Sequence, residues 1–184
     1  MGEPNAEPWP DPPLTGDDAT AIVAALERQR ATLAWKCGGL DAEGLRATTA
    51  ASTITLGGLL KHLALVEDNY FTRRIGGREM PPPWNAVDWD VEPDWDWRSA
   101  ADDTPDQLYA LWREAVARSR TALGEALDNG DLDQLVTTMT DDEGRSPSLR
   151  RVLLDTLEEY ARHVGHADLI RESVDGLVGE DRQH

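Results

Sequence analysis

Three histidines and one glutamate have the residue types and the spacing that could bind a metal ion. His62 lies in the segment TLGGLLKHLALVEDNYF, and Glu159, His163 and His166 lie in LEEYARHVGHADLIRE. The chain contains four histidines, and the fourth is the terminal His184. Three of the four therefore fall in apolar segments of helical spacing, which suggests a metal site.

Helix geometry limits which of these side chains can share one ion. An α-helix turns about 100° and rises about 1.5 Å per residue, so Glu159, His163 and His166 point to one side. Glu159 and His166 lie roughly 10 Å apart along the axis, too far for metal bonds of about 2 Å. His163 must pair with one or the other. Two ligands from one helix and a third from a facing helix are typical of catalytic zinc sites, and His62 is the histidine available as the third.

Each of these residues also has a structural interpretation. His62 could be a hydrogen-bonded core histidine, and Glu159 could be a surface acid paired with Arg162. His166 could be a ligand, a residue that orients a ligand, or part of the pocket lining. The single cysteine, Cys37, lies in an apolar pattern and is expected to be a buried small hydrophobe rather than a nucleophile.

Four long segments with helical periodicity must position these residues. The first is expected to begin at Asp17 or Asp18 and to end at Gly38. The others are expected over residues 54–75, from Thr104-Pro105 to Asn129, and from Ser146 or Ser148 to Gly176. Residues 135–150 are expected to form a plain loop or a short hairpin.

The connection between the second and third helices is long and rich in tryptophan. Because long irregular connections in compact domains are usually functional or disordered, and tryptophans argue against disorder, we expect it to be ordered. Its tryptophans could cover an active-site pocket or simply pack the segment onto the bundle; they are Trp84, Trp89, Trp95 and Trp97.

Length and composition narrow the class of protein. The 184 residues suffice for one domain, expected over residues 15–178 between a disordered Pro-rich tail at 1–14 and a tail at 179–184. A net charge of −17 disfavours nucleic acid and anionic membrane surfaces as partners. With one cysteine, no signal-peptide pattern and no apolar run of membrane-spanning length, the chain is expected to be cytoplasmic.

Four amphipathic helices predict an all-α protein, a four-helix bundle with a long crossover between helices two and three. Metal and ligand sites in such bundles lie between facing helices. His62 and the pair formed by Glu159 and His163 would meet there if the second helix packs against the fourth.

Two motifs resemble those of the DinB/YfiT-like superfamily, in particular an actinobacterial branch of uncharacterised proteins labelled mini-circle proteins. They are T-x-G-G-L-x-K-H-L in the second helix and E-x-x-R-H-x-G-H-x-D-x-x-R-E in the fourth. The resemblance covers roughly residues 17 to 178 and implies an up-down-down-up bundle that binds zinc or nickel through three side chains. Many members use three histidines, whereas this chain has Glu159 four residues before His163, as mycothiol-dependent maleylpyruvate isomerases do.

The resemblance implies that the metal ligands are His62, Glu159 and His163, and that His166 lines the pocket or orients a ligand. From the crossover segment, Trp84 and Trp89 are the candidate pocket residues. It also implies a metal-dependent enzyme that uses a low-molecular-weight thiol such as mycothiol, or activated water, on a small electrophile, and it implies a homodimer. The alternative is a metal-binding or small-molecule-binding bundle without turnover. A weaker alternative is an interaction module that docks a partner through the Trp-rich segment.

Overall fold

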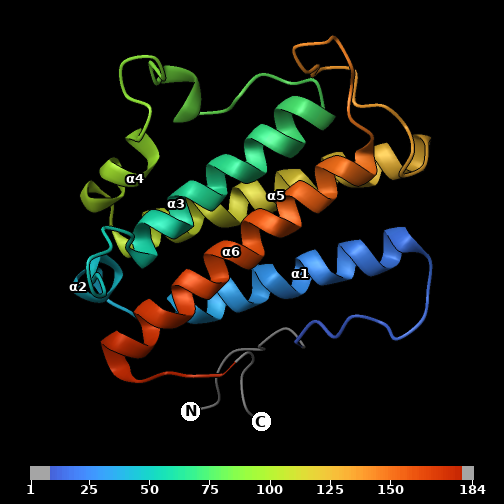
Figure 1. The fold of residues 1–184 in the computed structure, drawn as a ribbon. Helices are drawn as coiled ribbons and strands as arrows, with labels where there is room; N and C mark the ends of the chain where they lie inside the picture. Colours follow the sequence, from blue (N-terminus) through green and yellow to red (C-terminus); the bar gives the residue numbers. More distant parts are fainter. Residues whose placement is uncertain (1–8, 180–184) are drawn as a thin grey trace.

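The computed structural model describes residues 9–179 and is built from helices (Figure 1). Its four long helices are α1 (Asp18–Cys37), α3 (Leu56–Glu67), α5 (Pro105–Asn129) and α6 (Leu149–Asp175). Two short helices, α2 (Ala42–Arg46) and α4 (Trp95–Ser99), lie in the connections. Within residues 9–179 there is no strand, only an isolated bridge between Leu135 and Ser148 in the segment expected to be a loop or hairpin. The prediction of an all-α bundle is confirmed.

Three of the long helices, α1, α5 and α6, begin and end at residues that the sequence pattern indicates. The side chains of Asp17 and Ser148 cap the first turns of α1 and α6, each accepting a backbone N–H three residues further on. Thr104 and Gln107 form a reciprocal capping box at the start of α5. Gly176 ends α6 with φ of 78°, a left-handed conformation that glycine adopts without steric cost.

The second long helix differs from the expected single α-helix over residues 54–75. Thr55 caps it, so Ile54 lies outside, and its α-helical part ends at Glu67. The chain continues in the same direction as a π-helical segment, Asp68–Ile75. At its end the Gly76 amide donates to the Phe71 carbonyl five residues back at 2.8 Å, the wider spacing of a π-helix.

Ion pairs between α1 and α6 define their relative direction. Asp18 at the start of α1 pairs with Arg150 at the start of α6 at 2.7 Å. Lys36 at the end of α1 pairs with Asp168 near the end of α6 at 2.8 Å. The two helices therefore lie side by side and run in the same direction (Figure 1).

The other two long helices run in the opposite direction. Cys37 at the end of α1 lies 3.8 Å from the carbonyl oxygen of Leu56 at the start of α3, so α1 and α3 are antiparallel. Asp68, just after α3, accepts a hydrogen bond at 2.8 Å from Arg118 in the second half of α5, so α3 and α5 are parallel. The order along the chain is therefore up, down, down, up, as Figure 1 shows.

A buried polar network joins all four long helices in the interior. Arg30 of α1 donates two hydrogen bonds, at 2.7 and 2.6 Å, to the carboxylate of Glu67 in α3. Tyr160 of α6 donates to the same carboxylate at 2.6 Å, and Trp112 of α5 donates to the Tyr160 hydroxyl at 3.0 Å. Buried polar groups need such partners, so the network fixes how the helices sit against one another.

The crossover segment packs along the bundle (Figure 1). Trp84 is buried and lies edge-on against Trp95 at 6.1 Å between ring centroids. In the segment before α1, Trp9 lies edge-on against Trp35 of α1.

The expected tails fall partly at residues 1–8 and 180–184, outside the described residues. Within residues 9–179 no helix is long and apolar enough to cross a lipid bilayer.

Candidate metal centre

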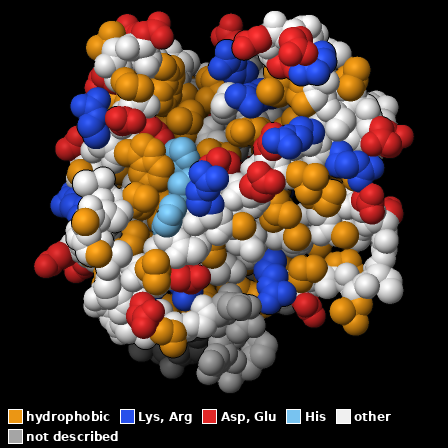
Figure 2. All heavy atoms as spheres, viewed as in Figure 1, with side chains coloured by type: hydrophobic (Ala, Val, Ile, Leu, Met, Phe, Trp, Pro, Cys, Tyr) orange, Lys and Arg blue, Asp and Glu red, His pale blue; other side chains and the backbone are white. Residues whose placement is uncertain are grey.

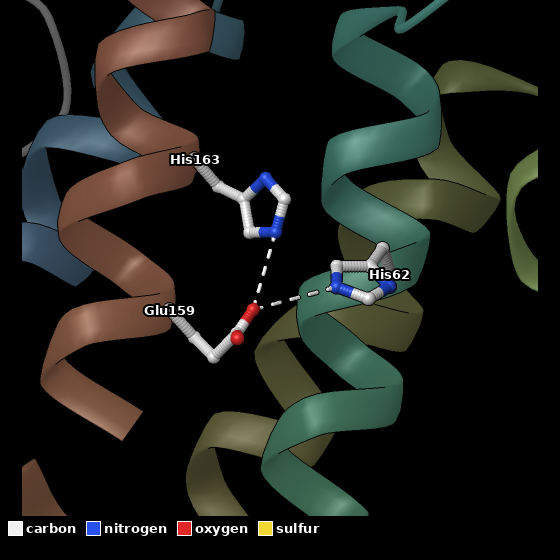
Figure 3. A group of neighbouring side chains, drawn as sticks. All are labelled: His62, Glu159 and His163. Atoms are coloured by element: carbon white, nitrogen blue, oxygen red, sulfur yellow. Dashed lines mark ion pairs between the residues drawn. The ribbon is translucent and has the colours of Figure 1, made fainter. Parts of the chain in front are cut away.

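Three side chains from two helices converge between α3 and α6 (Figure 3). His62 comes from α3, and Glu159 and His163 come from α6, one helical turn apart. The Oε2 atom of Glu159 lies 3.3 Å from Nε2 of His163 and 3.9 Å from Nε2 of His62. One nitrogen or oxygen atom from each residue lies within 4.8 Å of the others.

These distances fit the donor set of a divalent transition metal. Four ligands placed tetrahedrally at about 2.0–2.2 Å from zinc lie roughly 3.4 Å from one another. The observed separations therefore need only small side-chain movements to enclose one ion. Two imidazoles and one carboxylate are also the donors of catalytic sites that keep a fourth position open. The residues present fit a metal.

The alternative was that His163 pairs with His166 rather than with Glu159. These two histidines are in contact through a different nitrogen of the His163 ring. Nδ1 of His166 lies 3.3 Å from Nδ1 of His163, the ring nitrogen that does not face Glu159. His166 therefore touches the far side of the His163 ring and can hydrogen-bond to it. Contacts of this kind orient a metal-binding imidazole.

His163 is mostly buried, and this determines its charge. Burial, together with the neighbouring His62, lowers its pKa from 6.5 to about 4, while the Glu159 carboxylate opposes the shift. The imidazole is therefore neutral at pH 7. Neutral imidazole is the form that binds metals, so no proton has to leave His163 first.

Glu159 does not make the surface ion pair that its position allows. Among the described residues its carboxylate pairs with the two histidines, and no ion pair joins it to Arg162 on the outer face of α6. About a third of the Glu159 side chain is exposed. Figure 2 shows histidine side chains at the surface between hydrophobic side chains and a basic one, so the site can be reached from the solvent.

The crossover supplies two neighbours of His62. The sequence pattern did not single out Asp96, whereas Trp97 is one of the tryptophans expected to cover a pocket or to pack on the bundle. Asp96 of α4 is buried, and its Oδ2 atom lies 2.7 Å from Nδ1 of His62. The next residue, Trp97, stacks on the His62 ring at 4.4 Å with an angle of 22° between the rings. The pattern WDWRS has no helical or strand period, so only the expectation of a functional crossover pointed toward it.

The two tryptophans expected near the pocket make other contacts. Trp84 is buried and donates from Nε1 to Asp68 at 2.9 Å. Trp89 is partly buried against the hydrophobic core. A pocket of about 240 Å³ next to Trp97 is lined by α2 and by the starts of α3 and α5, and none of the three donors lines it.

The single cysteine is in the core, as expected. Cys37 is fully buried, and burial raises the pKa of its thiol to about 12. A thiol of that pKa is not a nucleophile at neutral pH. Any sulfur chemistry at this site must therefore use an external thiol.

The fold and the converging donors define a class: a helical-bundle protein with a candidate His-Glu-His metal centre between facing helices. The family model of the mycothiol S-transferases matches residues 21–176, which includes all four long helices apart from the first turn of α1. The chain belongs to this family. Mycothiol S-transferases are a DinB/YfiT-like family, so the resemblance seen in the two helical motifs is confirmed. No curated protein matches the chain.

Proposed function

We propose that this protein is a divalent-metal-dependent transferase that joins the sulfur of mycothiol to a small electrophile at the site formed by His62, Glu159 and His163. The observation that carries the proposal is the convergence of three metal-binding atoms within 4.8 Å in a chain of the mycothiol S-transferase family. A divalent cation held there would lower the pKa of a thiol so that the nucleophilic thiolate exists at neutral pH.

The chain's own residues have separate tasks in this proposal. His62, Glu159 and His163 hold the cation between α3 and α6, and the neutral state of His163 leaves it ready to bind. The part-exposed edge of the site admits the two small molecules. With an epoxide as electrophile, a carbon–sulfur bond forms, a carbon–oxygen bond breaks, and the thiol proton ends on the freed oxygen. No oxidant or reductant is needed.

The test compares two neighbouring glutamates of α6. Glu159→Gln removes the charge of a proposed ligand, whereas Glu158→Gln makes the same change on the outer face of the helix. With mycothiol and an epoxide or maleylpyruvate-like electrophile, we expect thioether formation or isomerisation by the wild type and by Glu158→Gln, and a large loss in Glu159→Gln.

The outcomes separate the proposal from its alternative. Wild-type protein that binds both the metal and mycothiol but turns over no member of a broad electrophile panel would be a binding protein without turnover. Equal activity of the two glutamine variants would rule out Glu159 as a ligand of the reacting centre.

A further inference from the structure

The contact between α4 and His62 reaches beyond the three proposed ligands. Asp96 is 34 residues from His62 in sequence, and its side chain is almost fully buried with 3% exposed. The 2.7 Å separation of Oδ2 and Nδ1 is that of a short, charge-assisted hydrogen bond. Because burying an unpaired carboxylate is costly, the hydrogen bond to His62 also stabilises Asp96 in its buried position.

The hydrogen bond determines which nitrogen of His62 carries the proton. A carboxylate accepts hydrogen bonds and cannot donate them, so Nδ1 of His62 is the donor. In the neutral ring Nε2 then keeps its lone pair, and this is the nitrogen that faces Glu159 at 3.9 Å. Two acceptors that face each other leave space for a cation between them.

Trp97 restrains the same ring in the other direction. Its indole stacks on the His62 ring and also lies over Gly58, one turn earlier in α3. A Cβ atom at Gly58 would lie 3.0 Å from Cε3 of Trp97, so glycine lets the indole approach this closely without a tight contact. Asp96 therefore fixes the ring within its plane, and Trp97 limits its tilt.

We propose that Asp96 is a positioning residue, which through its hydrogen bond to Nδ1 holds His62 as the tautomer whose Nε2 lone pair points at Glu159 and His163. The effect of Asp96 on metal binding rests on the proposed function. Its effect on the tautomer of His62 does not. Partners of this kind typically change metal affinity by about 10–100-fold when they are removed.

The first test uses metal-free protein and reads the tautomer directly. Nitrogen-15 chemical shifts of neutral histidine distinguish a proton on Nδ1 from one on Nε2. We expect His62 to carry it on Nδ1 in the wild type, and to lose that preference in Asp96→Ala. Asp96→Asn should keep it, because the amide oxygen still accepts. The control Asp94→Ala removes an exposed carboxylate of the same segment and should change nothing.

The second readout is the dissociation constant for Co²⁺ or Zn²⁺. Asp96→Ala should weaken binding by about 10–100-fold, Asp96→Asn should weaken it less, and Asp94→Ala should not. Thermal unfolding of each metal-free variant reports folding separately. A proton on Nε2 of His62 in the wild type, or the same tautomer in folded Asp96→Ala, would overturn the inference. Failure to bind any metal would instead count against the proposed function, because the tautomer is measured without it.

Discussion

At the scale of single residues, the site depends on the protonation of its imidazoles. The pKa of His163 is lowered to about 4, first by burial and then by the nearby His62. His62 donates from Nδ1 to Asp96, which leaves Nε2 toward the site. Two imidazoles and one carboxylate thus meet between α3 and α6, which is a donor set that suits a divalent cation.

The lowered pKa of His163 makes the stability of the metal-free protein depend on pH. An unfolded histidine takes up a proton below about pH 6.5, whereas folded His163 resists protonation until about pH 4. The free energy of unfolding should therefore fall as the pH decreases through this window, because the unfolded chain binds more protons. We expect His163→Asn, which cannot titrate there, to lack this part of the decrease.

The measurement is a pair of urea unfolding curves, at about pH 7 and about pH 5, for the metal-free wild type and for His163→Asn. Equal losses of unfolding free energy in both proteins would show that the buried imidazole does not carry the lowered pKa.

At the scale of the helices, much could be predicted from sequence because the determinants are local. Caps and stop signals such as Asp17, Thr104 and Gly176 act within one or two turns, so the bounds of α1, α5 and α6 follow from them. The same-side placement of Glu159 and His163 also follows from the 3.6-residue period. The change from α-helix to π-helix after Glu67 lacks such a local signal.

What could not be predicted are the contacts between distant segments. The meeting of His62 with α6 depends on how α3 and α6 pack, which the periodicity leaves open. Asp96 approaches His62 through α4, a five-residue helix in a segment without period, so its role became visible only in three dimensions. Trp84, taken from the same segment as a pocket residue, instead bonds to Asp68 in the interior.

Alanine substitutions at two helical glycines test how closely the helices pack around each position. Gly124 in α5 is exposed, and a Cβ atom added there would have no neighbour within 4 Å, so Gly124→Ala should raise the free energy of unfolding by about 0.5–1 kcal/mol. A Cβ at Gly57 in α3 would lie 3.1 Å from Leu108 and 3.2 Å from the Leu45 carbonyl oxygen. Gly57→Ala should therefore lower the free energy of unfolding by about 1–3 kcal/mol.

Chemical denaturation of both variants beside the wild type measures these changes. If Gly57→Ala proved as stabilising as Gly124→Ala, then α3 would not pack closely against α2 and α5.

At the scale of the whole molecule, one buried network links the four long helices that position the site. Glu67 accepts from Arg30 and Tyr160, and Tyr160 directly follows the proposed ligand Glu159 in α6. Its hydrogen bond to α3 therefore fixes the face of α6 that looks toward His62. The interior polar network and the surface site are connected through neighbouring residues of one helix.

Removing one partner of this network should lower the free energy of unfolding. Arg30→Met would leave the carboxylate of Glu67 buried without its cation, and we expect a loss of about 3–5 kcal/mol in the free energy of unfolding. Adding Glu67→Leu removes the unpaired charge and should recover part of the loss. Urea unfolding of the single and double variants measures both steps. A single variant as stable as the wild type would contradict the structural role given to the pair.

The central claim is that two helices jointly bind one divalent cation, and metal content measures it most directly. After equilibrium dialysis against Zn²⁺ or Ni²⁺, elemental analysis should find one equivalent per chain in the wild type and in Glu158→Gln. His62→Ala and His163→Ala, which lie on different helices, should each lose it while remaining folded. Wild-type protein without bound metal, or a full equivalent retained by both alanine variants, would contradict the account.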